Sequence, residues 1–289
     1  MTKTHRLLTL LFAIALLGAP VALEAQFNTN VNDSDRADCS AIEVTSDDYE
    51  VAHAEEVLTT LSGPVRVTAP RNGGVWITGS DGALEVRACK FAASRERSDA
   101  DAQLTGIHVQ AGGNEISAEG PGSGRWVVYF IVRAPRGASV TATTTNGPIS
   151  IRAVDGTVVA RATNGPIGIK DSRGQIDAET VNGPISVAGS SGELKLTAQN
   201  GPLAVKLDGA EWDGPGLQGR TENGPLTLTL PADYRSGVVV QADGRSPFRC
   251  SGCTDARRTW DDETRRIEFG PSPERIRLTT NNGPVTVKR

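Results

Sequence analysis

Two acidic residues are the first candidates for chemistry in this sequence. Asp177 and Glu179 stand two positions apart in a segment where polar and apolar residues alternate, so a β-strand would turn both carboxyl groups to the same side. Enzymes that cleave polysaccharides by acid and base catalysis use such a pair. Those enzymes also need a cleft, and an ordinary salt-linked strand face has the same composition. We therefore predict no catalytic residue and a protein that is not an enzyme.

The four cysteines are the second candidates. The chain begins with a typical export signal, so Cys39, Cys89, Cys250 and Cys253 are expected to form disulfides. Cys250 and Cys253 are close enough for a local loop, which favours pairing of Cys39 with Cys89, although four cysteines allow three connectivities. A redox Cys-x-x-Cys belongs at a helix start in an α/β context, and a zinc site needs more ligands nearby. The sequence offers neither, so we predict no metal.

Cofactor and nucleic-acid sites find little support. The glycine-rich segment 120–124 lacks the Lys-Ser/Thr ending of a phosphate-binding loop, so no cofactor is expected. A formal net charge of −4 gives no basic face for nucleic acid. Trp212, in a loop with Pro215 and Gly216 that interrupts the repeats described next, is the residue that we expect to contact a partner.

The elements that carry these residues are set by a repeat. Asn-Gly-Pro followed by Ile or Leu returns every 18 residues, and a second glycine turn lies halfway between, so the chain turns every nine residues. Within each nine-residue unit, the fourth and sixth residues are apolar or small and the fifth and seventh are mostly polar, as in a strand with one buried face. The four turns begin at Asn146, Asn164, Asn182 and Asn200, and the register returns after Asn223 and Asn282.

The repeat predicts an all-β fold, with two arrangements open. In a β-solenoid with two strands of about nine residues per 18-residue coil, the two strand faces cover each other. An antiparallel β meander or sandwich is the alternative, because Asn-Gly is a strong hairpin signal, but a meander would leave its apolar face open. The solenoid is favoured. It places Arg161 beside Glu179 and Asp177 beside Lys195, and it would stack the turn asparagines into an amide ladder of Asn146, Asn164, Asn182, Asn200 and Asn223.

The sequence divides into three parts. Residues 1–25 are expected to be a signal peptide, with an apolar run that is too short to span a bilayer comfortably. Residues 26–58 form an irregular N-terminal leader or cap. Residues 59–289 form the strand-repeat region, in which 236–289 cap the end. No comparable apolar stretch follows the signal, so we expect no transmembrane segment and an extracytoplasmic location: periplasm, cell surface or medium.

The order of these motifs resembles a known family. Residues 72–77 (NGGVWI), then 127–135 (VVYFIVRAP), then the Asn-Gly turns from Asn146 are similar to exported bacterial "putative adhesin" proteins of β-strand repeats, like head domains with a Gly-Ile-Asn-type repeat. The resemblance covers about residues 60 to 289. It implies a β-solenoid outside the cytoplasm, without catalytic residues to carry over. The chain departs from the family pattern in its Asn-Gly-Pro turns and its cysteines.

These features together predict a non-catalytic exported scaffold, an adhesin or a cell-envelope interaction protein, whose protein or glycan partner is unknown. A β-helix that binds or cleaves polysaccharide is the alternative. That alternative predicts a groove containing Trp212 or the pair of Asp177 and Glu179.

Overall fold

The computed structural model describes residues 28–31, 38–45, 48–59, 63–271 and 273–289. The expected signal peptide, 1–25, lies outside the described residues. The described part is all-β, as predicted, with one α-helix, α1 (Arg97–Thr105), and one 3-10 helix, η1 (Cys39–Ala41). A short antiparallel pair, β1 (Asn28–Val31) and β2 (Ile42–Thr45), forms a small sheet of its own beside two large mixed sheets.

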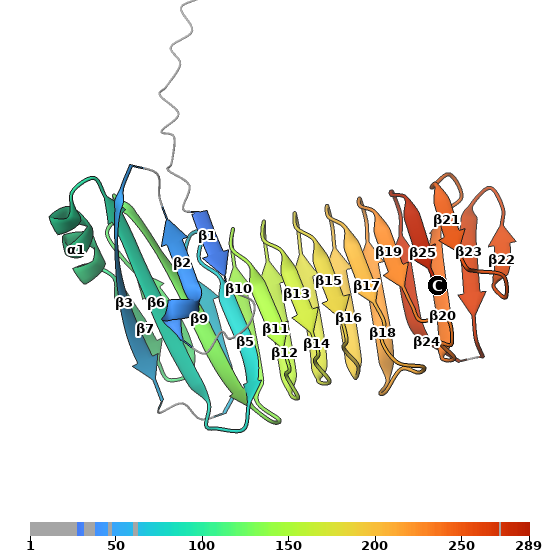
Figure 1. The fold of residues 1–289 in the computed structure, drawn as a ribbon, viewed down its shortest axis with the longest axis horizontal. Coiled ribbons are helices and arrows are strands. Elements are labelled where there is room, and N and C mark those ends of the chain that lie inside the picture. The colour runs from blue at the N-terminus through green and yellow to red at the C-terminus, as the bar shows by residue number, and fades with distance from the viewer. Residues whose placement is uncertain (1–27, 32–37, 46–47, 60–62, 272) are drawn as a thin grey trace, which may run out of the picture.

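The two large sheets run the length of the molecule (Figure 1). In spatial order, the 12-stranded sheet contains β22 (Arg257–Trp260), β23 (Thr264–Phe269), β20 (Gly237–Asp243), β24 (Glu274–Thr280), β18 (Gly216–Thr221), β16 (Glu193–Ala198), β14 (Gln175–Thr180), β12 (Thr157–Ala162), β10 (Ser139–Thr144), β4 (Val65–Ala69), β8 (Glu115–Glu119) and β7 (His108–Gly112). The 11-stranded sheet contains β21 (Phe248–Ser251), β25 (Val285–Lys288), β19 (Leu226–Thr229), β17 (Leu203–Lys206), β15 (Ile185–Ala188), β13 (Ile167–Lys170), β11 (Ile149–Arg152), β5 (Val75–Ser80), β9 (Arg125–Pro135), β6 (Glu85–Ser94) and β3 (Glu50–Leu58).

The regular central region, from β10 to β19, alternates between the sheets. β10, β12, β14, β16 and β18 lie in one sheet, and β11, β13, β15, β17 and β19 lie in the other. Each pairs in parallel with the next strand of its own sheet, so that Val158 stands beside Ile176 and Ile149 beside Ile167. The 18-residue period is therefore the step from one strand to its neighbour. Figure 1 shows these strands side by side along the long axis.

The core lies between the two sheets. Alternate side chains of each central strand point inward, and those of Ile149, Ile151, Val158 and Ala160 are at most 1% exposed. These are the fourth and sixth positions of the repeat, so the predicted buried face is confirmed. Burying one such branched side chain contributes about 1.5–3 kcal/mol relative to leaving it in water, which explains why so regular a pattern of apolar residues holds the sheets together.

Both ends depart from parallel pairing. At the N-terminal end, β6 pairs antiparallel with β3 and β9, and α1 lies beside β3 and β6. At the C-terminal end, β23 pairs antiparallel with β20 and β22. The last two strands turn back into the stack, since β24 lies between β18 and β20, and β25 lies between β19 and β21. The outermost strands at this end are thus β20 to β23, which precede β24 in the chain.

Candidate interaction surface

The turn asparagines form a continuous row of side-chain hydrogen bonds, which we call the asparagine ladder. Each amide nitrogen donates to the side-chain oxygen of the preceding asparagine in the row. From Asn164 to Asn146, from Asn182 to Asn164 and from Asn200 to Asn182, the donor–acceptor distances are 2.8, 2.8 and 3.0 Å. The row continues through Asn223 at 3.0 Å. Each amide in the middle of the row both donates and accepts, so the ladder links successive Asn-Gly turns.

The ladder is longer than the sequence analysis expects. Asn146 donates to Asn72 at 3.0 Å, across 74 residues of chain, and Asn282 donates to Asn223 at 3.0 Å, across 59. Both additional residues stand in the same register of the repeat, which is the signal that would have found them. They extend the ladder into both irregular ends.

The outer face of the 11-stranded sheet carries rows of like side chains. Outward residues at equal heights on β11, β13, β17 and β25 are Arg152, Lys170, Lys206 and Lys288, which we call the cationic row. Ala188 and Thr229 occupy the same position on the two intervening strands, β15 and β19. Three members of the row, Arg152, Lys170 and Lys206, line a shallow groove of about 400 Å³ that crosses β11 to β19, together with the Ser, Gly, Ala and Thr residues beside them.

The outer face of the 12-stranded sheet is different, because its charges are of both signs. Arg161 Nη1 lies 3.1 Å from Asp177 Oδ1, and its Nε lies 3.5 Å from Glu179 Oε2. Asp177 also stands beside Lys195 in the parallel register. The predicted neighbours Arg161 with Glu179 and Asp177 with Lys195 are therefore confirmed. Both candidate carboxylates share one guanidinium on a strand face, which is the salt-linked arrangement rather than an acid and a base across a cleft.

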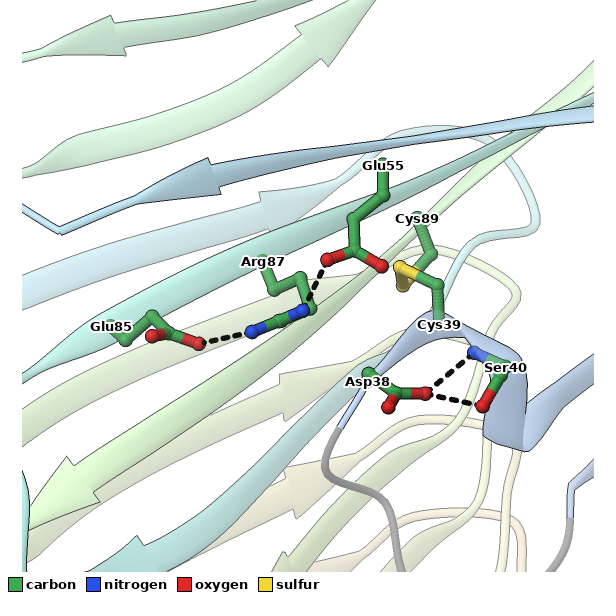
Figure 2. The surroundings of a disulfide bond; sticks show 7 residues. All are labelled: Asp38, Cys39, Ser40, Glu55, Glu85, Arg87 and Cys89. Atoms are coloured by element: carbon green, nitrogen blue, oxygen red, sulfur yellow. Dashed lines mark hydrogen bonds and ion pairs between the residues drawn. A yellow bond between two sulfur atoms is a disulfide. The ribbon is translucent and has the colours of Figure 1, made fainter.

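The Cys39–Cys89 disulfide fastens the N-terminal segment to the 11-stranded sheet (Figure 2). Cys89 lies on β6, and next to it Arg87 binds Glu55 of β3 and donates to Glu85 Oε1 at 2.9 Å. The segment after Cys39 lies over the outer face of this end of the sheet. There its apolar side chains bury Trp76, which is 2% exposed.

The second disulfide joins Cys250 to Cys253. It closes a short loop at the end of β21, the edge strand of the 11-stranded sheet, where Cys250 stands beside Val287 of β25. This bond therefore braces the C-terminal end of the stack. Both pairings are the ones that the sequence favours.

Trp212 lies within the core. Only 8% of the residue is exposed, its indole Nε1 donates to the carbonyl of Gly192 at 2.9 Å, and its backbone N–H donates to Ser236 Oγ at 2.8 Å. A buried indole with its N–H already satisfied fills space and holds the inserted loop to the stack. The position gives no support to a role in contacting a partner.

The tryptophan with the largest exposed surface in the described part is Trp260, at the end of the edge strand β22. It is 52% exposed, with the Arg265 guanidinium 5.6 Å from its ring and Phe248 at 6.2 Å. In the sequence it stands between arginine pairs and reads as part of a charged hairpin. The edge position, which determines the exposure, depends on strand order and is not visible locally.

The shifted pKa values in this end of the molecule arise from structural contacts. A hydrogen bond from Arg266 lowers the pKa of Glu268, and one from Arg289 lowers that of Asp255. Burial raises the pKa of Tyr234 to about 12. Within the described ranges, no three His, Cys, Asp or Glu side chains are placed to hold a metal ion. The same ranges hold no helix with the length and hydropathy of a membrane span.

The cationic row is the feature that the sequence analysis missed. Positions five and seven of all nine-residue units, taken together, carry charges of both signs. Sorting alternate units by sheet separates Arg152, Lys170 and Lys206, which follow Asn-Gly-Pro turns, from Arg161 and Glu179, which do not. The signal was present in the period of 18, and a period of nine conceals it.

Comparison with known proteins gives distant likenesses. No protein-family model matches the chain, and no curated protein matches it. A solved structure named "putative adhesin" from Bacteroides fragilis has 11% identity and a TM-score of 0.43, and covers 82% of this chain and 96% of its own. A "putative lipid binding protein" from Parabacteroides distasonis has 9% identity and a TM-score of 0.41, covering 83% and 96%.

A "putative cell adhesion protein" from Clostridium sporogenes has 13% identity and a TM-score of 0.34, covering 82% of this chain and 99% of its own. The adhesion names agree with the "putative adhesin" resemblance in the sequence motifs. At these identities and TM-scores, the neighbours bring no ligand, partner or activity to this chain.

Proposed function

We propose that this chain is an exported, non-catalytic β-solenoid that serves as an adhesin or interaction scaffold of the cell envelope. The observation that carries the proposal is the repeated parallel register from β10 to β19, in which two sheets bury each other's inward side chains. Both outer faces remain open and straight, so the fold presents long rows of side chains. An extended partner suits such a surface better than a small substrate that must be enclosed.

The pairing pattern supports the solenoid. Consecutive strands of this region lie in different sheets. Strands up to β17 pair with a strand one 18-residue step away, and β18 and β19 pair with strands 23 residues before them. The asparagine ladder follows the same step. Antiparallel pairing, which the meander requires throughout, is found at the two ends, in β3 with β6 and in β20 with β23.

The non-catalytic assignment rests on the outer face of the 12-stranded sheet. Asp177 and Glu179, the strongest catalytic candidates, are both ion-paired to Arg161. General acid–base catalysis requires one group that holds a proton and one that accepts it, within reach of the same bond. Asp177 and Glu179 instead share one guanidinium on an open strand face and do not stand on opposite sides of a bond to be cleaved.

The two disulfides support a location outside the cytoplasm, since such bonds persist in oxidising compartments. They brace the two ends of the stack, where an open sheet would otherwise expose unpaired strand edges. Export through the segment 1–25, the leader 26–58 and the cap 236–289 belong to the same proposal.

Binding and turnover measured on one preparation test the function. The purified chain should bind saturably to isolated bacterial envelopes and should release no new sugar ends from acidic polysaccharides. Variants Asp177→Asn and Glu179→Gln should bind as the parent does. Cleavage of a polysaccharide that Asp177→Asn abolishes would overturn the non-catalytic assignment, and absence of saturable envelope binding would overturn the interaction role.

A further inference from the structure

We propose that the cationic row on the outer face of the 11-stranded sheet binds a linear acidic polysaccharide lying along the stack. This inference deepens the proposed function, on which it rests, by assigning a site and a ligand class. The row consists of Arg152, Lys170, Lys206 and Lys288, aligned by the strand registers.

The geometry of the row suits an extended chain of charges. Neighbouring strands lie about 4.8 Å apart, so the cations of β11, β13, β17 and β25 are separated by about 5, 10 and 10 Å along the stack axis. The row thus spans about 24 Å. A compact anion would meet one or two of these side chains, whereas a polymer with charges at intervals would meet them all.

The charge on this face is of one sign. From β11 to β21, the outward strand positions of this sheet carry the four cations of the row and Arg249, and no acidic side chain. Lys170, Lys206 and Lys288 have no ion-pair partner among the described residues. The charges of these three lysines are therefore not neutralised by ion pairs within their own face, unlike that of Arg161 on the opposite sheet.

Two carboxylates, those of Asp171 and Asp208, lie in the next corner rather than among the residues that line the groove. Gly189, in the turn after β15, has Asp171 Oδ1 and Asp208 Oδ2 at 2.5 and 3.1 Å from the position that a Cβ would take. These two side chains accordingly gather over that turn. They flank the row without entering the groove beside it.

The groove beside the row favours a sugar chain over other polyanions. Ser150, Ser186 and Thr227 bring hydroxyl groups to it, and Gly168 and Ala204 leave room for a ring to lie against the sheet. Hydroxyl groups pair well with sugar hydroxyls. The groove has no aromatic lining for base stacking, which single-stranded nucleic acid uses. Its large apolar lining residues, Ile169, Val187 and Val205, are at most 3% exposed, so they do not project for insertion into a bilayer surface.

The site has a defined beginning. On the next strand, β5, the residue level with Ser150 is Trp76, which the Cys39–Val44 segment covers. The exposed face therefore starts at β11 and runs toward the C-terminal end. A ligand chain lies over β11 to β25 and stops at the covered segment.

Binding to immobilised polygalacturonate, with neutral dextran as reference, tests the site. The full chain should bind polygalacturonate and not dextran, and affinity should fall as salt rises. The triple variant Lys170→Gln, Lys206→Gln and Lys288→Gln should bind about tenfold to hundredfold more weakly, as expected for three partly solvated ion pairs. The control Lys195→Gln, Arg220→Gln and Arg277→Gln removes the same charge from the other sheet and should bind as the parent does.

A gain of affinity excludes misfolding as the explanation. Ala188 occupies a gap in the row between Lys170 and Lys206, and Ala188→Lys should tighten binding about threefold at low salt. Equal loss in both triple variants, or no loss in the first, would overturn the site. Tighter binding of duplex DNA or of phosphatidylglycerol vesicles through the same lysines would overturn the polysaccharide assignment. If the first triple variant keeps both its polygalacturonate binding and its envelope binding, the proposed function stands and this inference fails.

Discussion

The substitution Gly183→Ala tests whether the repeat is held by close stacking of its corners. A Cβ on Gly183 would lie 2.2 Å from the carbonyl oxygen of Gly165 in the preceding coil. Both atoms belong to or touch the backbone, so no side-chain rotation relieves the contact. Ordinary separation requires the corners to move apart by about 1 Å or more.

That movement acts on two hydrogen bonds next to the glycine. The backbone N–H of Asn182 donates to Thr163 at 2.8 Å, and its side chain donates to Asn164 at 2.8 Å. An additional 1 Å takes both beyond hydrogen-bonding distance, at about 0.5–1.5 kcal/mol each. Overpacking of the corner costs about 1–3 kcal/mol. The free energy of unfolding should therefore fall by about 2–6 kcal/mol.

Gly168→Ala is the matched control. Gly168 lies one coil earlier, within β13 and on the outer face, where a Cβ would meet only Ser186 Oγ, at 3.8 Å. The same change there should leave stability unaltered or raise it by up to about 1 kcal/mol, because alanine restricts the unfolded chain.

Urea unfolding of both variants measures the difference. Tryptophan fluorescence and far-ultraviolet circular dichroism should be followed together, since repeat arrays do not always unfold in one step. A lower midpoint for Gly183→Ala and an equal or higher one for Gly168→Ala is expected. Coincident midpoints for the two alanine variants would refute the close-stacking explanation.

Three further changes have defined outcomes. Asn182→Ala removes two bonds of the asparagine ladder and should lower the free energy of unfolding by about 1–2 kcal/mol. Asn282→Ala removes the ladder bond to Asn223 and should cost about half as much in the same urea assay. Replacing Cys39 and Cys89 by alanine removes a crosslink across 50 residues and should lower the free energy of unfolding by up to about 4 kcal/mol. Proteolysis of the N-terminal segment measures the effect, and a reducing agent should speed it in the parent but have little further effect in the double variant. The pKa of Tyr234 is raised to about 12 from about 10 in the unfolded chain. Its neutral phenol therefore stabilises the fold fully below pH 10, and this stabilisation is lost as pH rises toward 12. Tyr234→Phe should remove that part of the fall in urea midpoint at alkaline pH.

The strand positions could be predicted because the alternation of buried and exposed residues is encoded within each strand's own sequence. An inward residue such as Ile167 is apolar whichever partner strand covers it, so alternation alone locates β11 to β19. The 18-residue period then aligned Arg161 with Glu179, which lie in one register. These features depend on the pattern within a strand and on one step to its neighbour.

The glycine of the Asn-Gly turn has a different cause from the one suggested by local rules. A two-residue hairpin needs glycine for a positive φ, yet Gly147, Gly165 and Gly183 do not adopt one. Each instead faces the carbonyl oxygen of a glycine one step away in the stack, or of Gly73 in the case of Gly147. The residue is required by a contact distant in sequence, so no short window could assign its role.

The order of the C-terminal strands was also beyond local reading. β20 and β24 both carry apolar alternation suited to the edge beyond β18, and only the complete chain decides that β24 takes that place. The burial of Trp212 has a similar origin, since Gly192 and Ser236, which bind it, lie 20 and 24 residues away. The composition of the loop suggested that Trp212 is exposed, whereas the contacts with these distant residues bury it.

Residues that hold the fold together point inward, and residues available to bind a partner point outward. Inward residues and corner glycines must repeat, because each meets its equivalent in the next coil, and this requirement produces the visible period. Outward residues meet solvent, so they can differ between coils, as Lys170, Ala188 and Lys206 do at one height. The strand spacing nevertheless places whatever they carry at regular intervals. A change of ligand then needs only outward substitutions, and a substitution that disturbs stacking should alter affinity only as far as it alters the spacing of the cationic row.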